Sequence, residues 1–161
     1  MPDAITNTSP LVYLDRIHRL DWLPQLFREL WIPRAVVDEL NEGRSRGYQG
    51  PDLDAIAGMR VVESQTRPSE WLSADLGPGE LEAITLAIEN PGRVVILHDG
   101  LARRTAQAAG LDVWGTLRVL LEAKSAGLTD RIEPLVDQLS RAGLWFTEGV
   151  RRRVLALADK S

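Results

Sequence analysis

The stretch "AITNTSPLVYL", residues 4–14, contains the pattern that indicates how this chain folds. It reads as a short strand over residues 4–7, followed at once by a helix from Pro10 to about Leu20. We expect Thr8 or Ser9 to cap this helix, because hydroxyl side chains accept first-turn N–H groups and proline suits the first helical positions. Three roles stay open for Asn7 at the strand tip: a binding turn, a plain helix cap, or an active site that lacks one acid.

The same alternation of strand and helix continues to the end of the chain. Further extended segments are expected at residues 31–33, 59–62, 94–97 and 111–115. Helices are expected at residues 22–30, 34–42, 76–90, 101–109, 116–126, 130–142 and 147–159. Strands separated by helices favour a parallel sheet that is covered on both faces. The expected fold class is therefore α/β, in one domain over residues 1–161.

Composition excludes several classes of protein. The chain has no apolar run of the roughly 20 residues that span a membrane, and it has no cysteine. A cytoplasmic location with no membrane partner is expected, because a chain without disulfides fits a reducing compartment. Two histidines cannot build a zinc site without carboxylates. The net charge is −4, so nucleic-acid binding would need a local basic patch. The candidates, each of which could equally be a solvated surface, are Arg44, Arg46, Arg103, Arg104 and residues 151–153.

Ligands of open parallel sheets bind outside the carboxyl ends of the strands, which makes acids at those ends informative. Asp99 follows the buried run "VVIL", although it could simply cap the next helix. Glu80 begins the helix opened by "GPG" and shares a face with small alanines, although acids favour any helix N-terminus. Glu82 points elsewhere on that helix. Glu39 lies at the edge of a buried helical stripe and is otherwise a solvated glutamate.

Nucleotide-binding and hydrolase motifs are absent from the sequence. It contains no GxGxxG, no GxxxxGK[ST] and no GxSxG. Carboxylate chemistry with a hard divalent ion remains, because Mg²⁺ and Mn²⁺ take oxygen ligands. Two such ions can hold both oxygens of an in-line phosphoryl displacement.

Six segments in this order resemble the PIN-domain superfamily of metal-dependent ribonucleases, and more closely an uncharacterised PIN-like branch related to VapC-type toxins. They are "NTSPLVYL", "IPRAVVDEL", "LGPGELEAITLA", "VVILHDGLARRTA", "GLDVWGTLRVLLEAKSAGL" and "LVDQLSRAGLWFTEGVRRRVL". The resemblance implies an α/β/α sandwich with a parallel sheet of four or five strands. It also implies a catalytic set at Asn7, Glu39, Glu80 and Asp99. Metal ligation would fall to Asn7, Glu80 and Asp99, with help from Ser9.

The chain departs from this family pattern at two positions. The family has aspartate where this chain has Asn7, and the branch commonly has aspartate where this chain has His98. A unit charge pair at 4 Å is worth roughly 4 kcal/mol at an effective dielectric of 20, and desolvation offsets part of that. The amide should therefore weaken metal binding severely. Natural loss of the acid and deliberate replacement of an aspartate both fit the sequence.

The resemblance implies a Mg²⁺- or Mn²⁺-dependent endoribonuclease, the toxin of a type II toxin–antitoxin pair, that is inactive or weak in this Asn7 form. RNA contacts are expected from Arg103 and Arg104, and also from Arg44 and Arg46. An antitoxin partner and a homodimer are expected as well, with "LWFTEGV" as one apolar surface, unless those residues are core. The alternative is a catalytically dead PIN-like module that binds RNA or regulates.

Overall fold

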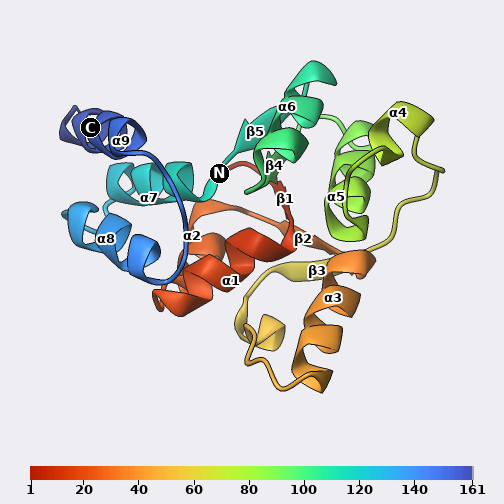
Figure 1. Cartoon of the computed structure of the whole chain (residues 1–161), viewed down its shortest axis with the longest axis horizontal. Coiled ribbons are helices and arrows are strands. Elements are labelled where there is room, and N and C mark those ends of the chain that lie inside the picture. The colour runs from red at the N-terminus through yellow and green to blue at the C-terminus, as the bar shows by residue number, and fades with distance from the viewer. Residues whose placement is uncertain (161) are drawn as a thin grey trace.

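Five parallel strands form the centre of the protein in a computed structural model that describes residues 1–160. The strand order is β3-β2-β1-β4-β5, with β1 in the middle (Figure 1). The strands are β1 (Ala4–Thr6), β2 (Leu30–Pro33), β3 (Met59–Val62), β4 (Val94–Ile96) and β5 (Asp112–Trp114). Every neighbouring pair is parallel. The expected α/β class and the five-stranded parallel sheet are confirmed.

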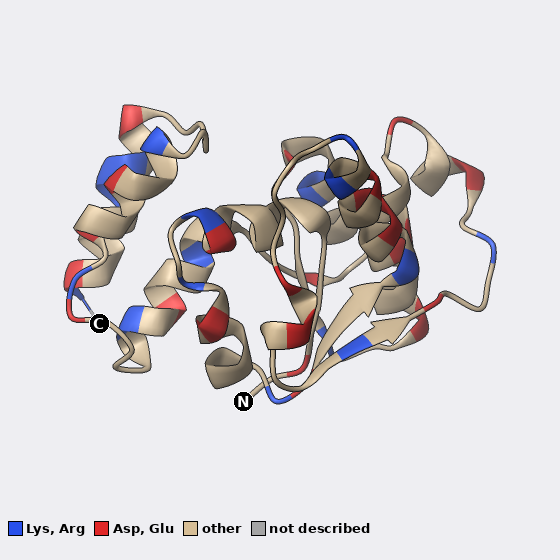
Figure 2. Cartoon of the chain, turned by 90° about the horizontal axis from the view of Figure 1, so that it is seen from below, with Lys and Arg blue, Asp and Glu red and all other residues tan. Residues whose placement is uncertain are grey.

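Helices connect the strands and then continue beyond the last one. They are α1 (Thr8–Arg16), α2 (Leu23–Leu26), α3 (Arg34–Ser45), α4 (Glu70–Ser73), α5 (Pro78–Glu89), α6 (Gly100–Ala108), α7 (Thr116–Ser125), α8 (Glu133–Arg141) and α9 (Glu148–Asp159). Two short 3-10 turns lie at Leu20–Trp22 and Leu53–Ala55. The C-terminal helices stand to one side of the sheet (Figure 2). No helix among the described residues is long and apolar enough to cross a membrane.

Strand residues alternate between two apolar cores, one on each face of the sheet. Ala4 packs in the core formed with α1, α2, α3 and α7–α9, whereas Ile5 packs in the core formed with α4, α5 and α6. Val94 and Ile96 of β4 join the first core, and Val95 joins the second. This alternation follows from the two-residue period of a strand. The sheet is therefore buried on both faces, and the sandwich expected from the resemblance is confirmed.

Several expected boundaries were wrong. The N-cap position of α1 is occupied by Asn7, not by Thr8 or Ser9, since Thr8 is already the first helical residue. The helix ends at Arg16 instead of Leu20, because His18 adopts a left-handed backbone conformation with φ +60°. α2 is short because the chain already extends at Leu30. α3 runs three residues further than expected, to Ser45.

The topology places one edge of the sheet where several segments meet. The chain moves outward from β1 to β2 and β3, then crosses over to β4 and β5 on the other side of β1. Such a reversal of strand order opens a crevice at the carboxyl ends of the central strands. Asn7 directly follows β1, Asp99 follows β4, and Thr116 follows β5. The candidate residues from three strands therefore share this edge.

Candidate active site

Asn7 is held rigidly between the two central strands. Its backbone N–H donates to the carbonyl of Ile96 at 3.0 Å, and its side chain is only 5 % exposed. The side chain does not cap α1, and its buried Oδ1 has no hydrogen-bond partner among the described residues. A buried acceptor without a donor costs about 1–3 kcal/mol. The plain helix cap therefore does not explain Asn7, and the amide oxygen is free to meet a cation or a donor.

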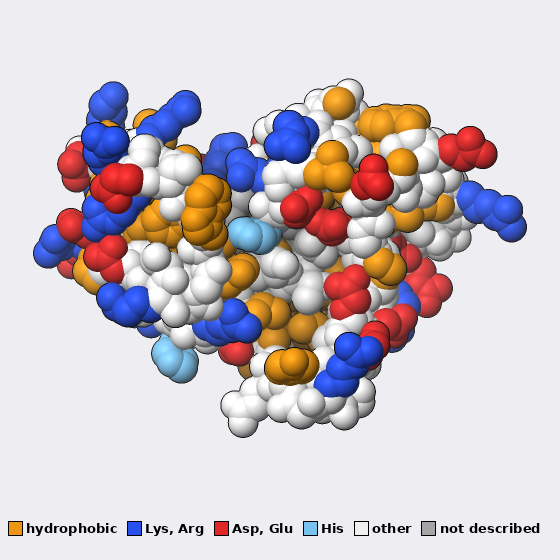
Figure 3. Space-filling model, in the orientation of Figure 1, with side chains coloured by type: hydrophobic (Ala, Val, Ile, Leu, Met, Phe, Trp, Pro, Cys, Tyr) orange, Lys and Arg blue, Asp and Glu red, His pale blue; other side chains and the backbone are white. Residues whose placement is uncertain are grey.

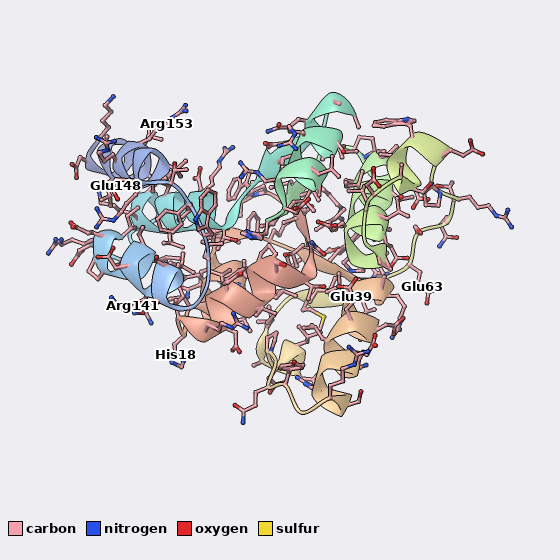
Figure 4. All side chains as sticks on the ribbon, in the orientation of Figure 1. His18, Glu39, Glu63, Arg141, Glu148 and Arg153 are labelled. Carbon is pink, nitrogen blue, oxygen red and sulfur yellow. The ribbon has the colours of Figure 1, made fainter. Side chains whose placement is uncertain are left out.

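Glu39 of α3 lies near this oxygen, on the other side of Gly79. Its Oε1 accepts the backbone N–H of Gly79 at 2.8 Å, and its Oε2 accepts the Thr8 hydroxyl at 2.6 Å. A Cβ on Gly79 would lie 2.7 Å from Glu39 Oε1 and 3.1 Å from Asn7 Oδ1. Glycine is therefore required for this close approach of α5 to α3 and α1. Figure 4 labels Glu39 on α3, near the places where α1 and α5 begin.

Glu80 and Asp99 complete the acidic set from two further helices. Glu80 Oε1 accepts the N–H of Gly77 at 3.2 Å, and Asp99 Oδ2 accepts the N–H of Ala102 at 3.1 Å. Burial raises the pKa of Glu80, and the negative charges of Asp99 and Glu39 raise it further. Asp99 and Glu39 are therefore close enough to Glu80 for their charges to act on it. Asp99 both caps α6 and belongs to the acidic set.

Glu82 has a different partner, as expected. Its carboxylate accepts the N–H of Ala35 at 2.8 Å and the Ser64 hydroxyl at 3.3 Å. It therefore satisfies the first turn of α3 and ties that helix to the segment after β3. This leaves Glu80 as the acid of α5 that faces Asp99.

His98 borders the acidic set. Burial lowers the pKa of His98, Asp99 raises it and the Arg103 charge lowers it. Its ring centroid lies 5.2 Å from that of Tyr13. Figure 3 shows one histidine side chain in a hollow beside the C-terminal helices and another at the edge of the molecule. His98 therefore lines the side of the site that faces α1.

The four predicted RNA-binding arginines separate into two pairs. Arg103 and Arg104 are exposed on α6, one turn after Asp99. Arg44 donates to the carbonyl of Pro51 at 2.5 Å, and Arg46 pairs with Glu42 at 2.7 Å. Both lie in or just after the last turn of α3, at the end away from the sheet (Figure 1). The fold brings only Arg103 and Arg104 near the acids.

The candidate ligands are of the type that a hard divalent cation prefers, but the distances between them do not suit binding by three acids to one ion. Asn7, Glu39, Glu80 and Asp99 offer only oxygens, as magnesium prefers, and Asn7 Oδ1 is unpaired. Within residues 1–160, however, no three His, Cys, Asp or Glu side chains are placed to hold one metal ion. Each carboxylate here accepts at least one backbone N–H, although it keeps further lone pairs. The predicted Ser9 lies half-buried in the first turn of α1, without a hydrogen bond among the described residues.

Two residues of the site were missed from the sequence. Thr8 donates to Glu39 across 31 positions of chain, and Gly79 makes room for that carboxylate. The "GPGE" signal pointed to a helix start at Gly79 but not to a contact. Nothing in the sequence distinguished Thr8 from Ser9, because the contact depends on where α3 packs.

The chain matches one family model and is similar to solved structures. A family model described as a PIN domain matches residues 3–160. A solved PilT N-terminus domain protein from Sulfolobus solfataricus superposes with a TM-score of 0.54 at 19 % identity, covering 73 % of this chain and 89 % of that one. A domain of a functionally unknown protein from Methanocaldococcus jannaschii gives a TM-score of 0.48 at 20 % identity, covering 71 % and 91 %. No curated protein matches. The chain belongs to the PIN-domain family, whose members are generally metal-dependent nucleases.

Proposed function

We propose that this protein has the site of a Mg²⁺- or Mn²⁺-dependent endoribonuclease, and that Asn7 leaves this form inactive or weak. The observation that carries the proposal is the unpaired, buried Oδ1 of Asn7 beside the Glu39 carboxylate, at the edge that Glu80 and Asp99 also face. An aspartate would fit the same space and would add one negative charge. The family supports nuclease chemistry, and the acidic set supports the use of a divalent ion.

The residues of the site divide into three groups in this proposal: ion ligands, residues that orient Glu39, and contacts to phosphate. Asn7, Glu39, Glu80 and Asp99 would share the ligation of the divalent ions, with no three of the acids on the same ion. The ions would supply an activated water and offset the charge of the phosphate. Thr8 and Gly79 fix the Glu39 carboxylate through two hydrogen bonds, so that it keeps one orientation. Arg103 and Arg104 hold the phosphate backbone of the RNA beside Asp99.

The test is the Asn7→Asp variant, compared with the parent chain on total RNA and tRNA in Mg²⁺ or Mn²⁺. We expect the variant to cleave at least about 100-fold faster, because the added charge strengthens cation binding by roughly 4 kcal/mol before desolvation is counted. EDTA should abolish the difference. Asn41→Asp adds the same charge on the exposed surface of α3 and should leave the rate unchanged.

A catalytically dead module that binds RNA or regulates is the second candidate. Asn7 itself, and the lack of a three-acid metal group among the described residues, favour it. In that case the Asn7→Asp variant would bind RNA without cutting it in either metal. Retention of Glu39, Glu80 and Asp99 at one edge supports the nuclease instead.

The partners are also part of the proposal. Trp145 is 80 % exposed, and Val150 and Leu157 of α9 are exposed as well, whereas Leu144 is core. These side chains give an antitoxin or a second copy an apolar surface, and aromatic residues are enriched at interfaces. A toxin–antitoxin role in the reducing cytosol fits the cysteine-free composition. Light scattering of the purified chain distinguishes a monomer from a homodimer.

A further inference from the structure

The N-terminus of α7 lies at the same sheet edge as the acids but has no acid of its own. Its N-cap is Gly115, its cap makes no side-chain hydrogen bond, and its first turn contains no acidic residue. Neighbouring helices at this edge differ, because Asp99 caps α6 and Glu80 caps α5. First-turn N–H groups and the helix dipole favour a negative ligand. α7 therefore presents its donors without an acceptor side chain.

A buried hydroxyl at this helix start also lacks a partner. Thr116 is the first residue of α7 and is 3 % exposed, and its Oγ1 makes no hydrogen bond among the described residues. Side chains lean toward the N-terminus of their helix, so this hydroxyl is directed to the same end as the free N–H groups. An unpaired buried hydroxyl is costly, which indicates a missing polar partner, and a hydroxyl can donate to an anion.

Arg103 supplies positive charge at the same place. Its Cζ and Nη1 lie 3.3 Å from the position that a Cβ on Gly115 would occupy. Its side chain is exposed, and no carboxylate within residues 1–160 forms an ion pair with it. The Arg103 charge also reaches His98 at the end of β4. A guanidinium, a hydroxyl and a free helix N-terminus thus lie together, and all three favour an anion.

We propose that Arg103, Thr116 and the α7 N-terminus form a phosphate-binding subsite next to the acids. Its assignment to the RNA strand rests on the proposed function. β5 pairs directly with β4, with Trp114 opposite Ile96, and paired strands lie about 4.8 Å apart. A phosphate held there would lie at the end of β5, next to the strand that Asp99 follows. The Thr116 hydroxyl is closed to solvent, so phosphate reaches it only if neighbouring side chains move. Arg103, which is exposed and lies over Gly115, is one such neighbour.

Inorganic phosphate is the first probe. Its binding to the parent chain is monitored by the NMR chemical shifts of the backbone amides of residues 115–117. We expect these amides to shift with phosphate, and Arg103→Gln to weaken binding about tenfold. Arg60→Gln removes the same charge at the β3 edge and should not change it. Absence of phosphate-induced shifts at residues 115–117, or equal effects of the two arginine variants, would overturn the subsite.

Thr116→Val separates a ligand role from a structural role. Because the hydroxyl has no partner, its replacement by a methyl group should leave the Tm unchanged or higher, while phosphate binding weakens several-fold. A lower Tm with unchanged phosphate binding would show that the hydroxyl is structural. Because Arg103 is exposed, Arg103→Gln should fold normally, and it still tests phosphate binding if Thr116→Val folds poorly.

A single-stranded RNA oligonucleotide then links the subsite to the substrate. For the parent chain, Arg103→Gln should reduce the slope of log affinity against log salt by about 0.7, the value for one phosphate contact on a single strand. An unchanged slope together with phosphate shifts at residues 115–117 would overturn the assignment to RNA. If Asn7→Asp cuts RNA but phosphate shifts no amide, the subsite fails and the nuclease stands. If phosphate shifts these amides but Asn7→Asp never cuts RNA, the phosphate subsite stands and the proposed nuclease fails.

Discussion

Each half of the candidate edge contains a buried polar atom without a hydrogen-bond partner among the described residues, and the charges around these two atoms differ. On the side of β1, α3 and α5, the unpaired atom is an acceptor, Asn7 Oδ1, among carboxylates. On the side of β5 and α7, it is the hydroxyl of Thr116, beside a guanidinium. Unpaired buried groups are rare. Here one lies among negative carboxylates and the other lies beside a positive side chain. The contrast is what the two proposals require, a cation on the first half and a phosphate on the second.

Two glycines provide the largest test of this contrast. Gly79→Ala places a Cβ 2.7 Å from a carboxylate oxygen held by two hydrogen bonds, so we expect a loss of about 1–3 kcal/mol in unfolding free energy. In the Asn7→Asp background it should also reduce cleavage at least tenfold. Gly115→Ala places its Cβ 3.3 Å from the end of the mobile Arg103 side chain and should be nearly neutral for stability.

Urea denaturation of both alanine variants measures the difference. Gly77→Ala is a further control, because its Cβ would lie 3.6 Å from the nearest atom and its φ of −70° suits any residue. Similar stabilities of Gly79→Ala and Gly77→Ala would mean that the acidic half is not tightly packed.

Two threonines give an intermediate effect. Thr8→Val removes a partly buried hydrogen bond to the Glu39 carboxylate and should destabilise the fold by about 1.5 kcal/mol, whereas Thr116→Val should not destabilise it. Thermal unfolding compares the two variants directly. Ser9→Ala should be neutral for stability; in the Asn7→Asp background, a selective loss of metal-dependent cleavage would support the prediction that Ser9 assists the metal.

The smallest effect concerns pH. Burial and the neighbouring acids raise the pKa of Glu80, so the folded state binds its proton more tightly than the unfolded state. Stability should therefore fall as pH rises through the window between the ordinary glutamate pKa and the raised value. Glu80→Gln removes this contribution and keeps the Oε1 that accepts the Gly77 N–H.

Unfolding curves between pH 4 and 8 test this sign. Glu80→Gln should be more stable than the parent at pH 7, and the gap should close toward pH 4. Asp38→Asn, on the exposed surface of α3, is the matched control. A constant gap at all pH values would place Glu80 outside the acidic region.

Residues at strand ends were the most predictable part of the site. Asn7 and Asp99 follow apolar strands, and the rule that ligands bind at the carboxyl edge identified both without coordinates. Glu80 was predictable because "GPGE" marks a helix start. Glu39 was less so, since its spacing on α3 equally suits a solvated glutamate.

The rest depended on packing between distant segments. The bond from Thr8 to Glu39, the space that Gly79 leaves and the placement of Arg103 over Gly115 all join different elements. Local patterns carry no information on such contacts. The predicted helix boundaries were wrong for a similar reason. The apolar pattern continues beyond Arg16, but the left-handed backbone of His18 ends α1 there.

The central position of β1 has a consequence for synthesis. β1 pairs with β4 through Ala4 and Val94, so the acids come together only after a loop of about 90 residues has closed. Pairings this distant in sequence form slowly. A nascent chain that has not yet released Asp99 from the ribosome lacks part of the acidic set. The order of translation therefore completes the acidic set only when the sheet is nearly whole.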